Sequence, residues 1–115
     1  MPIVEVSHDA DVPATILDDL ARILPHAVSL AVECPEEPYD HDLRPGDVEL
    51  RFRARGPRDV GGLTVTVEVR SRWFESRARD RQERCDALAR TLAATTGTTV
   101  GVFLSLPVAG WGEAP

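Results

Sequence analysis

Residues 48–70, VELRFRARGPRDVGGLTVTVEVR, contain the pattern that decides the fold. Apolar and polar residues alternate strictly over residues 48–55 and again over residues 63–70. This period of two is typical of strands with one buried face. Gly56-Pro57 and Gly61-Gly62 lie between the two runs, where glycine and proline favour a turn. The stretch therefore predicts two half-buried strands that follow one another directly along the chain.

On the N-terminal side, the pattern indicates one more strand and one helix. Residues 2–7 form a short apolar, β-branched run that is typical of a strand. Residues 11–31 carry apolar side chains at helical spacing, and Asp11 is the expected N-cap of that helix. Pro25 lies inside the helix, so we expect a kink or a break there.

On the C-terminal side, the pattern indicates a helix followed by a strand. The helix is expected from about Glu75 to Thr95, with Gly97 as its C-terminal stop. The last strand is marked by alternating apolar residues from Val100 to Leu106.

The resulting order β-α-β-β-α-β predicts the fold class. We expect an α+β two-layer sandwich in which a four-stranded sheet carries two helices on one face. A length of 115 residues suits a single domain, with a first β-α-β unit over residues 1–55 and a second over residues 62–112. The other face of the sheet carries arginine, threonine and glutamate, so it is either solvated or buried against another subunit.

Composition narrows the class of protein. A hydrophobic content of 43% and a charged content of 28% are typical of a globular domain. No apolar stretch approaches the roughly 18 residues of a membrane span, and the first residues lack a secretory pattern. We therefore expect a cytoplasmic protein with reduced thiols at Cys34 and Cys85. All thirteen basic residues are arginine, which excludes chemistry that needs a lysine Schiff base.

Pro2 is the residue that could supply the most unusual chemistry in this chain. It follows Met1 directly and opens the first strand. We expect Met1 to be removed because the residue behind it is small, which leaves a secondary amine on Pro2. A free α-amine has a pKa of about 7.7–8.0, and partial desolvation or a nearby cation lowers that pKa toward the value a general base needs at neutral pH.

Four stretches of the chain carry a resemblance to a known family. They are residues 2–9 (PIVEVSHD), 43–50 (LRPGDVEL), 72–77 (RWFESR) and 102–112 (VFLSLPVAGWG). Together with the element order, they resemble the tautomerase superfamily. The similarity is greatest to 5-carboxymethyl-2-hydroxymuconate isomerases and to 4-oxalocrotonate tautomerase-like proteins with an N-terminal proline.

This resemblance implies both an assembly and a reaction. Members are trimers whose sheets face the three-fold axis, with an active site around the N-terminal proline. The proline moves a proton between carbon and oxygen in the enol and keto forms of small anionic 2-oxo acids. The resemblance implies no metal and no organic cofactor.

The same resemblance suggests which residues assist Pro2. Arg72 takes the position of the family's anion-binding arginine, and Arg70, two residues earlier on the same strand, is the second candidate. Arginine suits this role because its planar fork binds a carboxylate with two hydrogen bonds. The alternative for Arg70 is a surface or interface salt bridge. Trp111 is expected as an apolar wall near the proline or as a plain packing residue, and His8 as a group that orients the substrate.

The chain also departs from the family pattern. Residues 7–9 (SHD) and 48–50 (VEL) stand where relatives often have further arginines. Arg51 or Arg53 would have to replace that charge. Glu49 could instead activate a water molecule, as carboxylates do in hydrating or dehalogenating members.

The clusters of histidine and arginine indicate neither a metal site nor a nucleic-acid-binding surface. His8 and His41 lie beside aspartates at residues 8–11 and 40–42, but without the spacing of a known metal motif, so solvated turns are the better explanation. The arginines of residues 70–84 alternate with acids, as in Asp80 and Arg84, which favours a salt-bridged helix face.

The sequence therefore predicts a cofactor-independent tautomerase or isomerase that uses Pro2 as its base. One alternative is a trimeric binding or structural module of the same fold without catalysis. Another is a hydratase or dehalogenase of the same superfamily.

Overall fold

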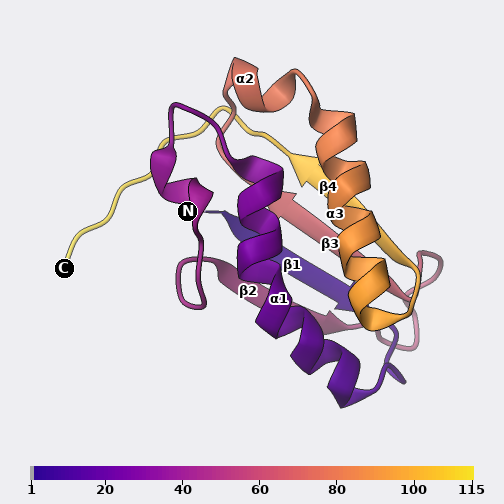
Figure 1. The fold of residues 1–115 in the computed structure, drawn as a ribbon. Helices are drawn as coiled ribbons and strands as arrows, with labels where there is room; N and C mark the ends of the chain where they lie inside the picture. The colour runs from indigo at the N-terminus through magenta and orange to yellow at the C-terminus, as the bar shows by residue number, and fades with distance from the viewer. Residues whose placement is uncertain (1) are drawn as a thin grey trace.

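The computed structural model describes residues 2–115 as a sheet with helices packed on one of its faces (Figure 1). The predicted removal of Met1 concerns a residue that lies outside this range. The strands are β1 (Ile3–His8), β2 (Glu49–Ala54), β3 (Val65–Arg70) and β4 (Val100–Ser105). The helices are α1 (Ala14–Val32), α2 (Glu75–Ala78), α3 (Arg81–Thr96) and the short 3-10 helix η1 (Pro38–His41). The predicted β-α-β-β-α-β sandwich is confirmed.

The order of strands in the sheet is β2-β1-β3-β4. β1 and β2 are parallel, β3 and β4 are parallel, and β1 and β3 are antiparallel at the centre. Two β-α-β units are thus joined side by side. In the central pair Ile3 lies opposite Arg70, so the beginning of β1 lies at the same edge of the sheet as the end of β3. This register positions the candidate site.

The core lies between the central strands and the two long helices. Every second side chain of β1 and β3 is fully buried there: Val4, Val6, Val65, Val67 and Val69. These valines pack against the apolar sides of α1 and α3, which include Leu20, Leu24, Val28, Leu88 and Leu92. Burying one such side chain stabilises the fold by about 1.5–3 kcal/mol.

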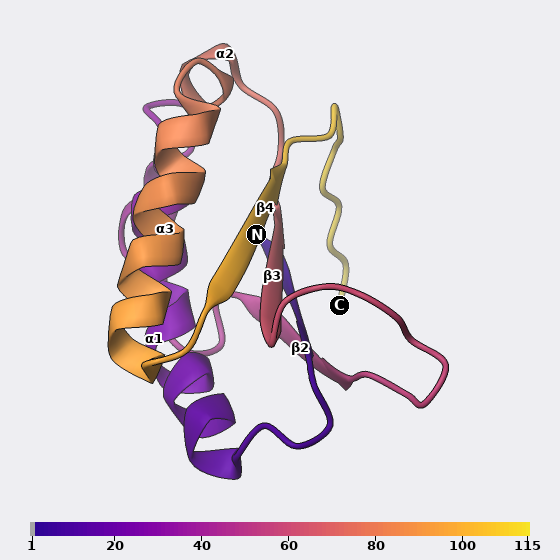
Figure 2. The same cartoon turned by 90° about the vertical axis from the view of Figure 1, so that its right-hand side faces the viewer.

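The other face of the sheet is not covered by a helix (Figure 2). In the part of the chain that the structure describes, residues 2–115, only the β2–β3 loop and the C-terminal segment extend on that side. The face carries Glu5, Glu68 and Arg70, and Phe103 is 70% exposed on it. The sequence left open whether this face is solvated or buried against a subunit.

Helix α1 is continuous through Pro25, so a break at this residue was a wrong expectation. The helix begins at Ala14 with Pro13 at the N-cap position, and Asp11 is not its cap. The Ser29 hydroxyl donates a hydrogen bond of 3.2 Å to the Pro25 carbonyl. The buried packing of residues around Pro25 in the core holds the helix together although one backbone donor is missing.

The second helix is divided, contrary to the expectation of one continuous helix. α2 ends at Ala78 and α3 begins at Arg81, with Asp80 outside helical geometry between them. Aspartate favours such a position because its side chain competes with the helical backbone for hydrogen bonds. The expected Asp80–Arg84 ion pair is present at 2.7 Å, and Gly97 ends α3 with a positive φ of 69°.

Strand β2 is less buried than its alternation predicts. Leu50 is half-buried, while Phe52 and Ala54 are exposed, although all three lie on the side that faces the helices. β2 is an edge strand of the sheet, with a neighbouring strand on one side only. Among residues 2–115, no helix is both long and apolar enough to cross a membrane.

Candidate functional site

A pocket of about 270 Å³ lies at the end of the sheet where the central strand β1 begins and its neighbour β3 ends. Four segments of the chain meet there: the start of β1, the loop after α1, the end of β3 and the C-terminal segment. The residues that line the pocket are Ile3, Glu37, Arg70, Ser71, Arg72, Pro107, Ala109, Gly110 and Trp111. One part of the wall is apolar and another carries charged groups of both signs.

Pro2 lies directly beside this pocket. It precedes Ile3, which lines the pocket, and its own side chain is fully buried. The Pro2 carbonyl accepts a hydrogen bond of 3.3 Å from the Glu49 backbone N–H. Continuing the β1–β3 register by one residue places Pro2 opposite Ser71, next to Arg72. The backbone thus brings Pro2 and the predicted anion-binding arginine to one edge of the sheet.

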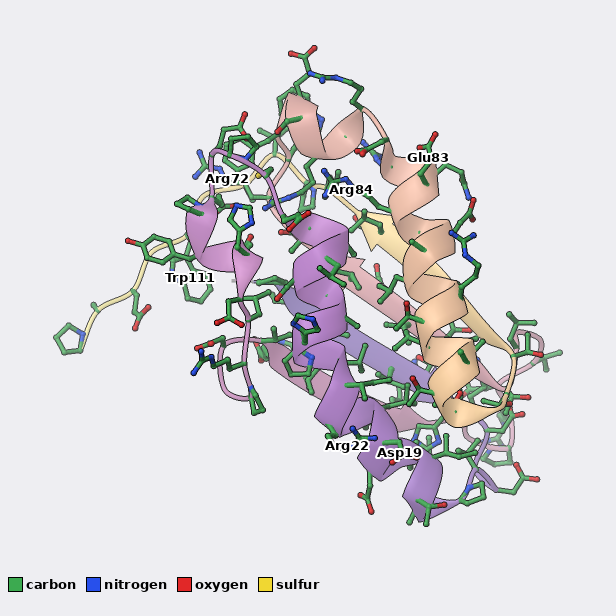
Figure 3. All side chains as sticks on the ribbon, viewed as in Figure 1. Asp19, Arg22, Arg72, Glu83, Arg84 and Trp111 are labelled. Atoms are coloured by element: carbon green, nitrogen blue, oxygen red, sulfur yellow. The ribbon has the colours of Figure 1, made fainter. Side chains whose placement is uncertain are left out.

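Arg72 offers an exposed cation at the pocket. Its guanidinium lies 5.1 Å from the centre of the Phe74 ring, a cation–π contact. Within residues 2–115, its side chain forms no ion pair or hydrogen bond with a protein group. Figure 3 shows Arg72 and Trp111 on the same side of the molecule, where the C-terminal segment leaves the sheet. The charge of Arg72 is therefore free to meet an anionic ligand.

Arg70 lines the same pocket but is shared with the open face of the sheet. Its guanidinium contacts the carboxylates of Glu5 at 3.4 Å and Glu68 at 3.7 Å. Its buried Nε atom has no hydrogen-bond partner in the described chain. The salt-bridge alternative raised by the sequence thus describes most of what Arg70 does in a single subunit.

Trp111 and His8 occupy opposite parts of the molecule. Trp111 is 60% exposed and forms part of the apolar wall of the pocket. His8 ends β1 at the far edge of the sheet, is buried on the helix side, and has its Nδ1 atom 2.8 Å from the Asp9 carbonyl. The structure brings Pro2, Arg70, Arg72 and Trp111 together, and it does not bring His8 to them.

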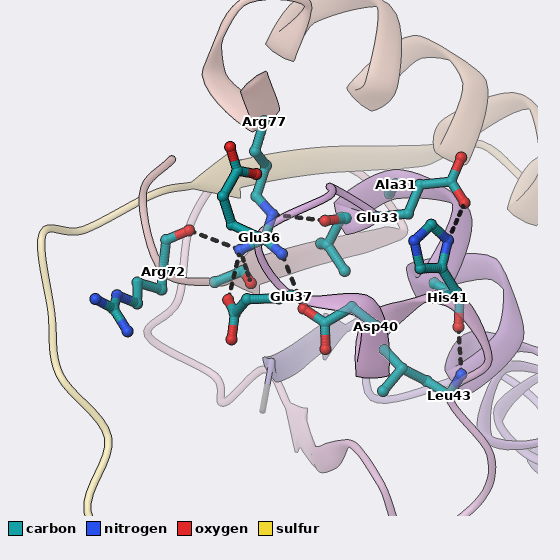
Figure 4. A network of polar contacts seen from close by, with 12 residues as sticks. Ala31, Glu33, Glu36, Glu37, Asp40, His41, Leu43, Arg72 and Arg77 are labelled. Atoms are coloured by element: carbon teal, nitrogen blue, oxygen red, sulfur yellow. Dashed lines mark hydrogen bonds and ion pairs between the residues drawn. The ribbon is translucent and has the colours of Figure 1, made fainter. Parts of the chain in front are cut away.

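A residue that sequence reasoning did not single out, Arg77, holds the pocket in place. Its side chain is fully buried and donates hydrogen bonds to five groups, as the close-up in Figure 4 shows in part. The acceptors are the Val32 carbonyl at 2.6 Å, the Arg72 carbonyl at 2.7 Å, Asp40 Oδ2 at 2.8 Å, Ser71 Oγ at 2.9 Å and Glu37 Oε1 at 3.2 Å.

Three of the five acceptors of Arg77 belong to residues that line the pocket: Glu37, Ser71 and Arg72. Arg77 therefore joins the loop after α1 to the segment after β3. The only sequence signal for it was its place at the end of the RWFESR stretch, residues 72–77. Hydrophobic periodicity does not predict that Arg77 is buried, because an arginine does not belong to an apolar stripe.

The loop of residues 34–46 contributes Glu37 to the wall of the pocket and is held against the helices by hydrogen bonds. The Ser76 hydroxyl donates to Glu36 at 2.8 Å, which lowers the pKa of Glu36, and the Leu43 N–H donates to Ser29 Oγ at 2.7 Å. Burial, followed by the charge of Glu37, raises the pKa of Asp40 in spite of its contact with Arg77. The loop thus delivers Glu37 to the pocket and Asp40 to Arg77.

The remaining candidates from the sequence lie away from the pocket. Arg51 is paired with Glu49 at 3.0 Å, and Arg53 with Asp59 at 3.3 Å. In residues 2–115, no three histidine, cysteine or acidic side chains gather as a metal site would require.

Comparison with known proteins identifies the fold. No family model matches the chain, and no curated relative does. Solved structures match over almost the whole length. A macrophage migration inhibitory factor-like protein of Entamoeba histolytica has a TM-score of 0.60 and 15% identity, covering 98% of this chain and 95% of that chain. A fused 4-OT that forms a symmetric trimer has a TM-score of 0.61 and 19% identity, covering 97% and 91%.

The chain has the tautomerase fold. Malonate semialdehyde decarboxylase shares it with a TM-score of 0.62 and 16% identity, covering 98% of this chain and 91% of that chain. The resemblance expected from the four sequence stretches is confirmed at the level of this fold. Structural matches at identities this low establish the tautomerase fold. They do not establish the substrate or the reaction.

We predict that Asp40→Asn changes how stability depends on pH. The ordinary pKa of this carboxyl is 3.8, and it is raised in the folded chain. Folding therefore favours the protonated form, so the contribution of Asp40 is fully present below 3.8 and is lost as pH rises through the folded pKa. Asparagine keeps an acceptor for Arg77 without titrating. Wild type should lose stability relative to the variant over this window, by at most about 1.4 kcal/mol per pH unit.

Urea unfolding of both proteins at one protein concentration and several pH values measures this difference. Asp42→Asn, an exposed position in the same loop, is the control and should leave the pH profile unchanged. A gap between wild type and Asp40→Asn that stays constant or grows in favour of wild type with pH contradicts the prediction.

Proposed function

We propose that this chain is a cofactor-independent tautomerase that interconverts enol and keto forms of a small 2-oxo carboxylate, with Pro2 as the general base. The observation that carries the proposal is the Arg72 guanidinium, which has no carboxylate partner in the described chain and lines a partly apolar pocket next to Pro2. A cation beside a base is what proton abstraction next to a carbonyl requires.

Pro2 supplies the base once Met1 has been removed. The nitrogen is then a secondary amine at the start of a strand. The Pro2 side chain is buried, and a buried environment disfavours the charged form of an amine, which suits a general base at neutral pH. Malonate semialdehyde decarboxylase, which has the same fold, has also been solved with alanine in place of the proline at its first position. This similarity supports a functional proline at the same end of β1.

Arg72 binds the substrate carboxylate in this proposal, and Arg70 assists it from the end of β3. Trp111 and Ile3 exclude water from the reacting carbon, which strengthens the attraction between the arginines and the developing enolate. We assign no step to His8, because it lies at the other end of β1. Its role in orienting a substrate stays a prediction from the sequence.

We also propose a homotrimer. The face of the sheet opposite the helices is uncovered, and it combines the exposed Phe103 with the charged groups of Glu5, Glu68 and Arg70. A self-complementary surface of this kind is suited to contact with further copies of the chain. The fused 4-OT of the same fold is a trimer. A cytoplasmic location remains part of the proposal on composition alone.

The principal alternative is a trimeric binding module without catalysis. If Met1 is retained, the Pro2 nitrogen is an amide and cannot act as a base. Arg72 would still bind a carboxylate in the pocket. The hydratase or dehalogenase alternative has less support, because the Glu49 carboxylate is paired with Arg51 and does not line the pocket.

We predict that Pro2→Ala lowers kcat/KM for phenylenolpyruvate ketonisation by about a hundredfold or more, the usual contribution of a general base. Intact mass spectrometry of the protein from its natural host should show that Met1 is absent. Pro57→Ala, in an exposed turn, is the matched control. Retention of Met1, or unchanged turnover by Pro2→Ala, would sink the base assignment.

We predict that Arg72→Ala mainly raises KM, by about tenfold or more, since a hydrogen bond to a charged group contributes about 1.5–3 kcal/mol. Arg79→Ala removes another exposed arginine, one that does not line the pocket, and its kinetics should match wild type. Steady-state kinetics of both variants measure the effect. Equal kcat/KM values for Arg72→Ala and wild type would count against the assignment.

We predict a trimer by light scattering at micromolar protein concentration. Phe103→Glu places a charge on the uncovered face, at the edge strand β4, and should shift the protein toward the monomer. Leu30→Glu, on the exposed side of α1, is the control and should not. A monomeric wild-type protein would contradict the proposed assembly.

A further inference from the structure

The two ends of the pocket differ in charge. Arg70 and Arg72 approach from the end of β3, whereas Glu37 approaches from the loop after α1. The Glu37 side chain is 27% exposed and lines the pocket. An anion that binds to Arg72 therefore lies in a pocket whose wall also contains a carboxylate.

Arg77 does not cancel the charge of Glu37. The single guanidinium of Arg77 contacts two carboxylates, Glu37 at 3.2 Å and Asp40 at 2.8 Å. With both carboxyls ionised, this group of three has a net charge of −1. Asp40 is 4% exposed and Arg77 is 0% exposed, so Glu37 is the member that presents the remaining charge to a ligand.

A second, larger cavity of about 590 Å³ continues the negative side beyond the pocket. It shares Glu37 and Trp111 with the first pocket and is also lined by Asp42, Asp47 and Glu113. Arg44 pairs with Asp42 at 3.0 Å, which offsets part of this charge. The charged residues of the lining thus change from arginines at the end of β3 to mostly acidic residues in the second cavity.

We propose that Glu37 determines substrate specificity: the site takes a monocarboxylate whose other end carries an uncharged or cationic hydrogen-bond donor, and it rejects dicarboxylates. This inference rests on the proposed function, since it concerns the same pocket. The substrate carboxylate binds to Arg72, and the Glu37 carboxylate accepts a hydrogen bond from the donor at the far end. A second carboxylate at that end would be desolvated next to a like charge.

The test compares three probes on the wild-type chain. Phenylenolpyruvate is a monocarboxylate, 4-hydroxyphenylenolpyruvate adds a hydroxyl donor at the far end, and 2-hydroxymuconate is a dicarboxylate. Dissociation constants are measured by tryptophan fluorescence in the Trp73→Phe background, in which Trp111 is the remaining tryptophan. We expect the hydroxylated monocarboxylate to bind about tenfold or more tightly than the dicarboxylate.

Glu37→Gln removes the charge while keeping the size of the side chain and an oxygen that accepts from Arg77. The variant should bind 2-hydroxymuconate about tenfold more tightly than wild type and phenylenolpyruvate within about twofold. Glu36→Gln, which removes a charge from the adjacent residue outside the pocket, is the matched control and should leave the ratio unchanged. Equal effects of the two variants would show that general charge, not Glu37, is responsible and would overturn the inference.

The wild-type protein alone provides a second test that does not depend on a folded variant. Raising ionic strength from about 20 mM to about 0.5 M should reduce the preference for the monocarboxylates. Equal binding of monocarboxylates and dicarboxylates at low salt would overturn the inference.

Turnover separates this inference from the proposed function. Selective binding of the probes without turnover would contradict the proposed tautomerase activity and support the proposed role of Glu37 in specificity. Turnover of the probes without discrimination between them would support the tautomerase activity and contradict the role of Glu37. Absence of binding for all three probes would overturn both.

Discussion

The architecture of the candidate site depends on the buried guanidinium of Arg77. An arginine without solvent exposure is tolerated only where its donors are satisfied and its charge is balanced. Arg77 meets this condition with two carboxylates, two backbone carbonyls and one hydroxyl. Because these groups come from the end of α1, the following loop and the segment after β3, the ion holds three separate parts of the chain in one arrangement.

Arg77 also donates a hydrogen bond to the C-terminal end of α1. The last carbonyls of a helix have no partner within the helix. Arg77 donates to the Val32 carbonyl, and Arg84 donates to those of Ala31 at 3.0 Å and Glu33 at 2.9 Å. Two arginines of the second β-α-β unit therefore close the helix of the first. The break in the helix at Asp80 separates the short α2, which carries Arg77, from α3, which carries Arg84.

The chemistry of the pocket follows from the central antiparallel pair of strands. Because β1 and β3 run in opposite directions, the first residues of β1 lie beside the last residues of β3. Pro2 and Arg72 are seventy positions apart in the chain and share one edge of the sheet for this reason. The C-terminal segment then adds Trp111 as an apolar wall, and the loop after α1 adds Glu37, so positive, apolar and negative surfaces meet around one small space.

The sequence by itself determined the order of the strands and long helices, because alternation and helical periodicity are local consequences of side-chain direction, but not the division of the second helix at Asp80. It also determined which residue could be a base, since Pro2 needs only its position behind Met1. Only the tertiary structure decided that Arg77 is buried, that Glu37 lines the pocket, that Arg70 is largely occupied by glutamates and that His8 lies at the far edge. Those facts depend on strand register and on which charged groups meet across long sequence separations, and such pairings leave no periodic mark on the chain.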